Sequence, residues 1–156
     1  SWYQAPADPK DGKWIEHVIG QVDKCHSLKV ADFDNDGDLD VFAAEMPNIA
    51  QEAPHPVMIF INQGDSLTWG KQVLADYGSY SAQIGDIDND GDIDVIGLRN
   101  HDRAPIEMWR NISTLSAGDQ LWISLKLALF FQIAFQPPEQ VWGLNNWVCF
   151  SNQKPP

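Results

Sequence analysis

Residues 32–40 read Asp-Phe-Asp-Asn-Asp-Gly-Asp-Leu-Asp, and residues 86–94 repeat them as Asp-Ile-Asp-Asn-Asp-Gly-Asp-Ile-Asp. The two nonapeptides are identical at seven of nine positions, start 54 residues apart, and differ only by exchanging one apolar residue for another. Each places five carboxylates on alternate residues, so ten acidic side chains are crowded into two short segments. Such crowding is repulsive unless a cation lies among the carboxylates, and Ca²⁺ takes several oxygen ligands from tight loops of this kind.

The sequence therefore predicts two Ca²⁺ sites, one in each loop. The candidate ligands are Asp32, Asp34, Asp36, Asp38 and Asp40 in the first loop and Asp86, Asp88, Asp90, Asp92 and Asp94 in the second. We expect side-chain oxygens from four aspartates of each loop and the main-chain carbonyl oxygen from Asp38 and Asp92. The alternative is a pair of acidic surface turns without metal, because Asp-Gly is a common turn sequence.

The segments that flank the loops predict strands rather than helices. Each loop begins like an EF-hand loop, but position 12 is Ala43 or Gly97 instead of a bidentate Glu. The flanking runs are short and rich in β-branched residues, as in strands. We expect strands at residues 14–19, 26–31, 39–44, 57–62, 69–74, 80–85, 93–98 and 106–111. Each loop is then a calcium-clasped turn between two β-strands.

A D-x-D-x-D-G-x-x-D loop between two such strands resembles the FG-GAP/VCBS-type repeats, the calcium-binding blades of integrin-α-like β-propellers. The resemblance covers about residues 14–127 and implies an all-β fold with two four-stranded blades. Residues 1–13 then form a lead-in, and residues 128–156 form a C-terminal extension. Closed propellers have four to eight blades. Two blades are an incomplete propeller, so we expect a larger protein or an assembly of several copies.

The segment at residues 121–135 has large apolar residues at every odd position. This period of two predicts a strand whose apolar face contacts another subunit or another blade. The expected contact residues are Leu121, Ile123, Leu125, Leu127, Leu129, Phe131, Ile133 and Phe135. A buried helix, or a strand that folds back over its own blades, is the alternative. The run is shorter than a membrane helix and contains Lys126 and Gln132, so we do not expect a membrane span.

Charge and composition restrict the partners. The chain of 156 residues has a net charge of −12, which two Ca²⁺ ions would change to −8. Because proteins that bind nucleic acid are basic, we do not expect nucleic acid as a partner. The start of the chain has no signal-peptide pattern, so we interpret it as a mature or excised segment of an exported protein. Asn111 opens an Asn-x-Ser sequence and is a candidate glycosylation site, and Cys25 and Cys149 can form a disulfide or remain free.

Three functions are compatible with these features. The first is a calcium-binding extracellular repeat module that acts as a binding or scaffold unit for a glycan or a protein. The second is a self-assembling structural protein in a ring or filament. The third is a fragment of a secreted carbohydrate-active enzyme such as a polysaccharide lyase, with His26 as a candidate general base. The sequence contains no other catalytic motif, so a binding role is favoured over an enzyme.

Overall fold

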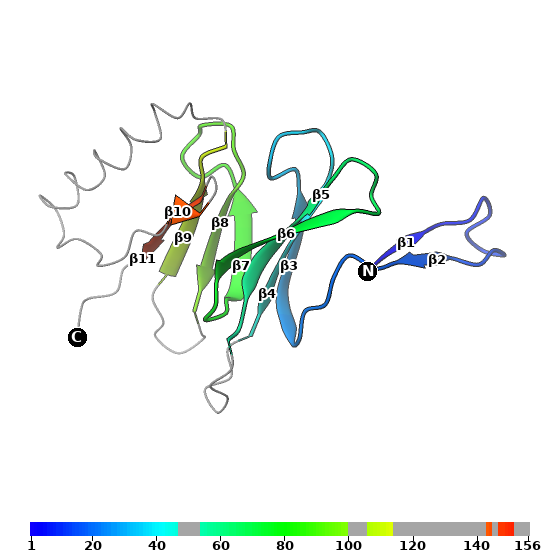
Figure 1. The fold of residues 1–156 in the computed structure, drawn as a ribbon, viewed down its shortest axis with the longest axis horizontal. Coiled ribbons are helices and arrows are strands. Elements are labelled where there is room, and N and C mark those ends of the chain that lie inside the picture. Colours follow the sequence, from blue (N-terminus) through cyan, green and yellow to red (C-terminus); the bar gives the residue numbers. More distant parts are fainter. Residues whose placement is uncertain (47–53, 100–105, 114–142, 145–146, 152–156) are drawn as a thin grey trace, which may run out of the picture.

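The computed structural model describes residues 1–46, 54–99, 106–113, 143–144 and 147–151. All the regular structure in this part of the chain is β-strand, in three antiparallel sheets, none of which closes into a barrel (Figure 1). The prediction of an all-β fold is confirmed. The strands are β1 (Trp2–Gln4), β2 (Ile15–His17), β3 (Cys25–Ala31), β4 (Asp40–Glu45), β5 (Val57–Asn62), β6 (Trp69–Ala75), β7 (Tyr80–Gly85), β8 (Asp94–Leu98), β9 (Ile106–Asn111), β10 (Gly143–Leu144) and β11 (Trp147–Ser151).

The first sheet has four strands in the order β3-β4-β5-β6. The central strands β4 and β5 are almost entirely buried, which explains their nearly continuous apolar sequence. The residues of the edge strands β3 and β6 are mostly exposed or half-buried, as expected of half-covered strands. Each strand boundary of this meander lies within one residue of its predicted position.

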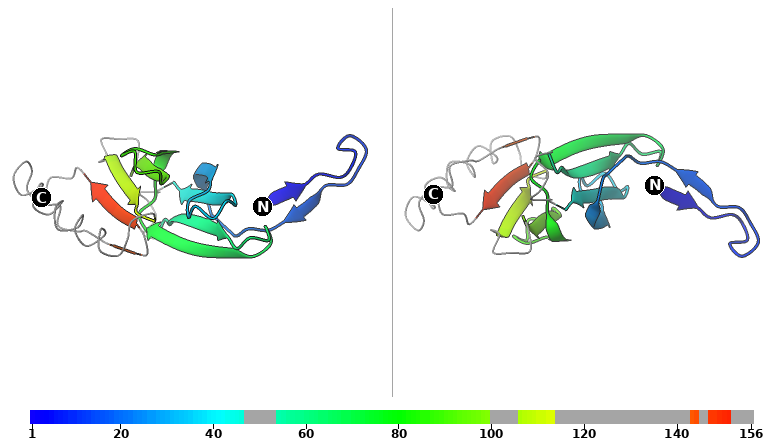
Figure 2. Two further views of the ribbon diagram at one scale, coloured as in Figure 1. Left: turned by 90° about the horizontal axis from the view of Figure 1, so that it is seen from above. Right: turned by 90° about the horizontal axis from the view of Figure 1, so that it is seen from below.

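The second sheet repeats this order as β7-β8-β9 and adds β11 and β10 beyond β9. The loop from β7 to β8 is the second acidic nonapeptide, as the loop from β3 to β4 is the first. The two sheets lie against each other through one apolar core (Figure 2). The first sheet contributes Phe42, Val57 and Ile59 to this core, and the second contributes Val95 and Trp109.

The edge strands β3 and β7 also lie side by side at this junction. The backbone N–H of Ala82 donates a 2.9 Å hydrogen bond to Oγ of Ser27, and Nζ of Lys29 donates one of 3.1 Å to Oε1 of Gln83. Strands β3 and β7 do not pair with each other as a β-ladder. They are joined instead by the Ser27 hydroxyl and by the side chains of Lys29 and Gln83. The sheets are therefore two separate layers that share a core.

The strand that begins with tryptophan belongs to a different unit from the one we expected. Trp69 opens β6, which closes the sheet of the preceding loop by pairing Trp69 with Asn62. The corresponding earlier segment, β2, pairs with β1 in a separate hairpin and joins neither large sheet. The lead-in at residues 1–13 thus contains a strand of its own. Its Trp2 stacks on His17 and donates a 2.8 Å hydrogen bond to the carbonyl oxygen of Ser66.

The segment assigned to a C-terminal extension contributes to the second sheet. Strand β11 pairs with β9 and places Trp147 opposite Asn111, the register in which Trp69 lies opposite Asn62. The open edge of β9 offers unpaired backbone groups, and a strand from far along the chain can satisfy them. The expected contact residues of the 121–135 segment lie outside the described residues.

Candidate metal centres

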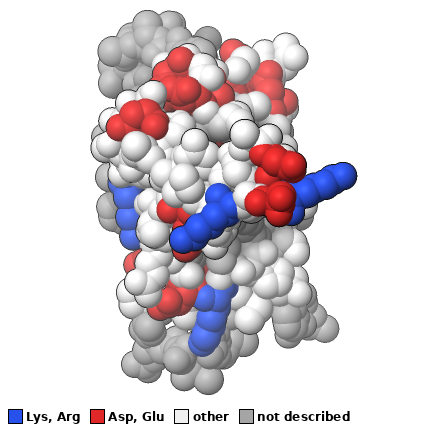
Figure 3. All heavy atoms as spheres, turned by 90° about the vertical axis from the view of Figure 1, so that its right-hand side faces the viewer, with Lys and Arg blue, Asp and Glu red and all other residues white. Residues whose placement is uncertain are grey.

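The two acidic loops lie next to each other at one end of the paired sheets. Both leave the ends of neighbouring edge strands, β3 and β7, so they emerge on the same side (Figure 1). A hydrogen bond of 2.6 Å joins them directly, from Nδ2 of Asn35 in the first loop to Oδ1 of Asp92 in the second. The space-filling view shows acidic side chains gathered toward this end of the molecule (Figure 3).

The loops share one backbone conformation. The asparagine at the fourth position has φ of 61° in both, and the glycine at the sixth has φ of 96° (Gly37) or 94° (Gly91). Asparagine and glycine are the residues that adopt positive φ most readily. In both loops the glycine N–H donates to the first aspartate, over 3.0 Å to Asp32 and 3.1 Å to Asp86. The repeated sequence thus produces the same turn twice.

Each turn brings three of its five aspartates together. Carboxylate oxygens of Asp32, Asp34 and Asp40 lie within 4.8 Å of one another, and so do those of Asp86, Asp88 and Asp94. The described residues therefore contain two acidic clusters able to hold a metal ion, at matching positions of the two loops. These clusters contain six of the ten predicted ligands.

The remaining four predicted ligands are Asp36, Asp38, Asp90 and Asp92, which lie outside the two clusters. Asp36 and Asp90 accept hydrogen bonds from the backbone N–H groups of Asp38 and Asp92, over 2.9 and 3.0 Å. The carboxylate of Asp92 is fully buried and bound by Asn35. For Asp38 and Asp92 this agrees with the expectation of a main-chain carbonyl ligand, whereas Asp36 and Asp90 were expected to supply side-chain oxygens.

The last aspartate of each loop holds the turn to its sheet. Asp40 is fully buried; its Oδ2 accepts from the N–H of Phe33 and its Oδ1 from the N–H of Asn62, both over 2.8 Å. Asp94 accepts in the same way from Ile87 over 3.0 Å and from Asn111 over 2.8 Å. One carboxylate thus joins the loop, its own strand and the end of the next strand. Each oxygen retains a lone pair with which it can bind a cation.

The electrostatics favour a bound cation. Burial raises the pKa of the Asp40 and Asp94 carboxyls, although the two backbone N–H donors at each oppose this shift. Partial burial, followed by repulsion from Asp36, raises the pKa of Asp34. In addition, Oδ1 of Asp32 is shielded from solvent and has no hydrogen-bond donor. A hard cation such as Ca²⁺, bound through oxygen, would relieve both the repulsion and this unsatisfied acceptor.

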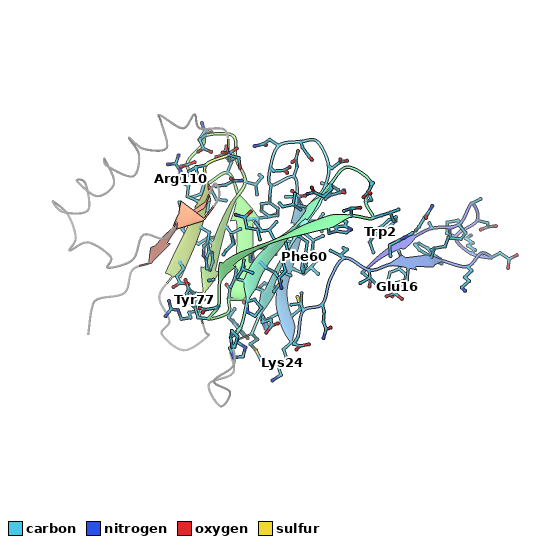
Figure 4. All side chains as sticks on the ribbon, viewed as in Figure 1. Trp2, Glu16, Lys24, Phe60, Tyr77 and Arg110 are labelled. Carbon is cyan, nitrogen blue, oxygen red and sulfur yellow. The ribbon has the colours of Figure 1, made fainter. Side chains whose placement is uncertain are left out.

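The second loop differs from the first by a nearby arginine. The guanidinium of Arg110, on β9, forms ion pairs with Oδ2 of Asp88 through Nε and with Oδ2 of Asp90 through a terminal nitrogen, the latter over 2.8 Å. Figure 4 labels this side chain at the loop end of β9. The matching position in the first sheet is Ile61, so the difference between the two loops is visible in the aligned repeats.

Asn111 is buried in a way that does not suit glycosylation. Its side chain is fully buried, and its Nδ2 donates to the carbonyl oxygens of Phe33 and Ile93 over 2.6 and 3.3 Å. A glycan on this nitrogen would have to displace both hydrogen bonds and enter the core. This burial argues against modification of the folded chain, and the three-residue pattern itself carries no information on burial.

His26 lies away from the acidic clusters. Its ring stacks on that of Tyr80 with centroids 4.0 Å apart, and it is exposed near the start of β3, whereas the first loop follows the end of that strand. Six residues of extended chain separate the ring from Asp32 by about 20 Å. The carboxylates of the metal clusters are therefore too far from His26 to act with it in catalysis. Cys25 carries a free, exposed thiol.

Comparisons with protein-family models, with curated proteins and with solved structures gave no match. The resemblance to FG-GAP/VCBS repeats therefore stays a prediction that rests on the sequence of the loops. Among the described residues, no helix has the length and apolar character needed to cross a membrane. The case for a function thus depends on the geometry of the loops and of the two sheets.

Proposed function

We propose that the chain is a calcium-binding module of an extracellular protein, in which two FG-GAP/VCBS-type blades form a binding or scaffold unit. The observation that carries this proposal is the duplication of one cluster. Two loops with nearly the same sequence, closely matching φ angles and the same hydrogen bond from the glycine N–H to the first aspartate each bring three carboxylates within 4.8 Å. Both loops also keep the last aspartate buried, at Asp40 and Asp94, which an acidic turn that served only for solubility would not require.

Calcium suits the donors better than other common metals. All the clustered donors are carboxylate oxygens, which favour hard cations over zinc or copper. Magnesium requires a smaller octahedral site and gives up its water reluctantly, whereas calcium accepts irregular oxygen cages. Modules outside the cell function at millimolar calcium, which a modest affinity suffices to bind. This last point supports an extracellular location for the protein.

The test is isothermal titration of the EDTA-treated, full-length chain with CaCl₂. We expect two ions to bind per chain, and magnesium at the same concentration to compete weakly. A variant with both Asp34→Ala and Asp88→Ala is the control, because it removes one clustered carboxylate from each loop but spares the buried Asp40 and Asp94. No heat at millimolar calcium from a chain that is folded by circular dichroism would refute the proposal.

Assembly is a second candidate, and a difference between the sheets favours it. Val57 and Phe33, on the side of the first sheet that contacts the second, are 0% and 2% exposed. Their counterparts in the second sheet, Ile106 and Ile87, are 50% and 46% exposed. The apolar positions that the first sheet buries against the second sheet are therefore exposed in the second sheet itself. A further blade, from a longer chain or from another copy, has the chemistry to cover it.

Light scattering coupled to size-exclusion chromatography tests this candidate. We expect the full-length chain to elute above its monomer mass and the variants Ile87→Lys and Ile106→Lys to shift toward the monomer. Leu67→Lys is the matched control, because Leu67 is similarly exposed, at 59%, but lies in the turn between β5 and β6. A monomeric wild type in calcium buffer would contradict assembly of this chain with itself.

A further inference from the structure

The two loops have the same sequence, but the strand end beside each of them carries a different charge. Strands β5 and β9 end in Asn62 and Asn111, which occupy equivalent positions and donate their backbone N–H to Asp40 and Asp94. The residue before each asparagine is Ile61 in the first sheet and Arg110 in the second. This position is therefore fixed relative to its loop in both sheets, and only its side chain differs.

Arg110 uses that position to enter the second loop. Its side chain is 13% exposed, and its guanidinium contacts two carboxylates at once, those of Asp88 and Asp90. Asp88 is itself a member of the second metal cluster. The charge of the arginine thus lies directly beside the oxygens that a calcium ion would bind, and part of it is shielded from solvent.

The first loop has no such cation. Among the described residues, no lysine or arginine forms an ion pair with a carboxylate of residues 32–40. Repulsion among the carboxylates is therefore partly neutralised in the second loop and not in the first.

We propose that Arg110 is a built-in counter-ion of the second loop, which a calcium ion has to displace, so that the two sites bind calcium with unequal affinity. This inference rests on the proposed calcium function and adds its regulation. A positive charge within about 4–6 Å of a carboxylate disfavours the approach of a second cation. An ion entering the second site must compete with Arg110 for the carboxylate of Asp88, whereas no lysine or arginine among the described residues pairs with a clustered carboxylate of the first site.

Unequal sites fill in order. The first loop takes up calcium at low concentration, and the second responds only as the concentration rises further. Between these two steps the second loop is held by arginine, which explains how it keeps its shape at low calcium. A single module therefore has one structural and one responsive site, although the sequences of its loops predict identical ones.

Single-site variants make the difference measurable. In a chain with Asp32→Ala and Asp34→Ala only the second site remains, and in one with Asp86→Ala and Asp88→Ala only the first does. Calorimetric titration with CaCl₂ gives one affinity for each. We expect the second site to be about tenfold weaker, a difference that one neighbouring charge readily produces.

Exchange of the charge provides the decisive comparison. With only the second site intact, Arg110→Met should raise the calcium affinity of that site about tenfold. Arg110→Lys keeps the positive charge, so the affinity should stay close to that of the unchanged site. With only the first site intact, Ile61→Arg should weaken its binding by a similar factor. Both positions are partly exposed at strand ends, so we expect the variants to fold; circular dichroism in EDTA checks this.

The outcomes separate the two proposals. If neither site binds calcium in any variant, the proposed function fails. If both sites bind, but with equal affinity and without response to Arg110→Met, calcium binding stands and the counter-ion inference is refuted. If the second site stays empty even in Arg110→Met, the arginine does not compete with calcium, and the inference is refuted as well.

Discussion

Replacing Asp40 and Asp34 by alanine, one at a time, separates the part of the loop that holds the fold from the part that holds the metal. Asp40 is fully buried and accepts two backbone hydrogen bonds of 2.8 Å, from Phe33 and Asn62. Asp34 is exposed, and it accepts one hydrogen bond of 3.3 Å, from the N–H of Asp36. Both carboxylates belong to the same metal cluster.

The expected costs differ in size and in their dependence on calcium. Asp40→Ala leaves two N–H groups beside a buried space without acceptors, at about 1–3 kcal/mol each. The substitution also removes the cost of burying a charged carboxylate, a cost that the raised pKa of Asp40 reflects, and this offsets part of the loss. We therefore expect the free energy of unfolding to fall by about 2–4 kcal/mol in EDTA. Asp34→Ala should change the free energy of unfolding by no more than about 0.5 kcal/mol in EDTA. In calcium at 100 times the dissociation constant it should cost about 2.7 kcal/mol.

Urea unfolding followed by tryptophan fluorescence, in EDTA and in calcium, measures all four values. Asp94→Ala and Asp88→Ala repeat the experiment in the second loop, where the buried aspartate accepts from Ile87 and Asn111. The reasoning is refuted if Asp40→Ala is as stable as the wild type in EDTA. It is also refuted if Asp34→Ala loses as much stability in EDTA as Asp40→Ala does.

Two further predictions concern protons and the buried ion pair. The raised pKa values of Asp40 and Asp94 mean that the folded chain binds protons more readily than the unfolded one, so in EDTA the thermal midpoint should rise as pH falls from 7 toward 5. Calcium should abolish this rise, because it binds the ionised carboxylates; a midpoint in EDTA that falls over this range contradicts the assignment. Glu107 is fully buried and paired with Arg99 over 2.7 Å, so Arg99→Met should cost about 3–5 kcal/mol by urea unfolding. Adding Glu107→Met, the residue at the matching position 58, should restore most of it, and a double variant no more stable than the single one would count against this pairing.

The local elements were predictable because each is encoded within a few residues. The acidic repeat gave the position of both turns, and the β-branched runs beside them gave β3, β4, β7 and β8 to within one residue. The clustering of Asp32, Asp34 and Asp40 also follows from alternate spacing around a tight turn. These features depend on backbone geometry that one short segment determines by itself.

The pairing of distant segments was not predictable in the same way. The repeat showed that a tryptophan strand recurs, but not which sheet it joins, and β6 closes the preceding unit rather than opening its own. Strand β11 reaches β9 across more than thirty intervening residues, which no local pattern reports. The burial of Asn111 and the entry of Arg110 into the second loop depend on the same long-range arrangement.

The buried aspartates explain how one loop can serve both fold and metal. Because Asp40 and Asp94 bind backbone N–H groups, each turn keeps its shape in EDTA, and calcium needs to order only the exposed aspartates beside it. The bond from Asn35 to Asp92 then connects the loops, so an ion that fixes one loop also fixes a hydrogen-bond partner of the other. Any such coupling has to be reciprocal, since the two binding free energies share one thermodynamic cycle. Under the proposed function, the contact between the loops, rather than either loop alone, is therefore where a bound calcium ion would act on the relative position of the two sheets.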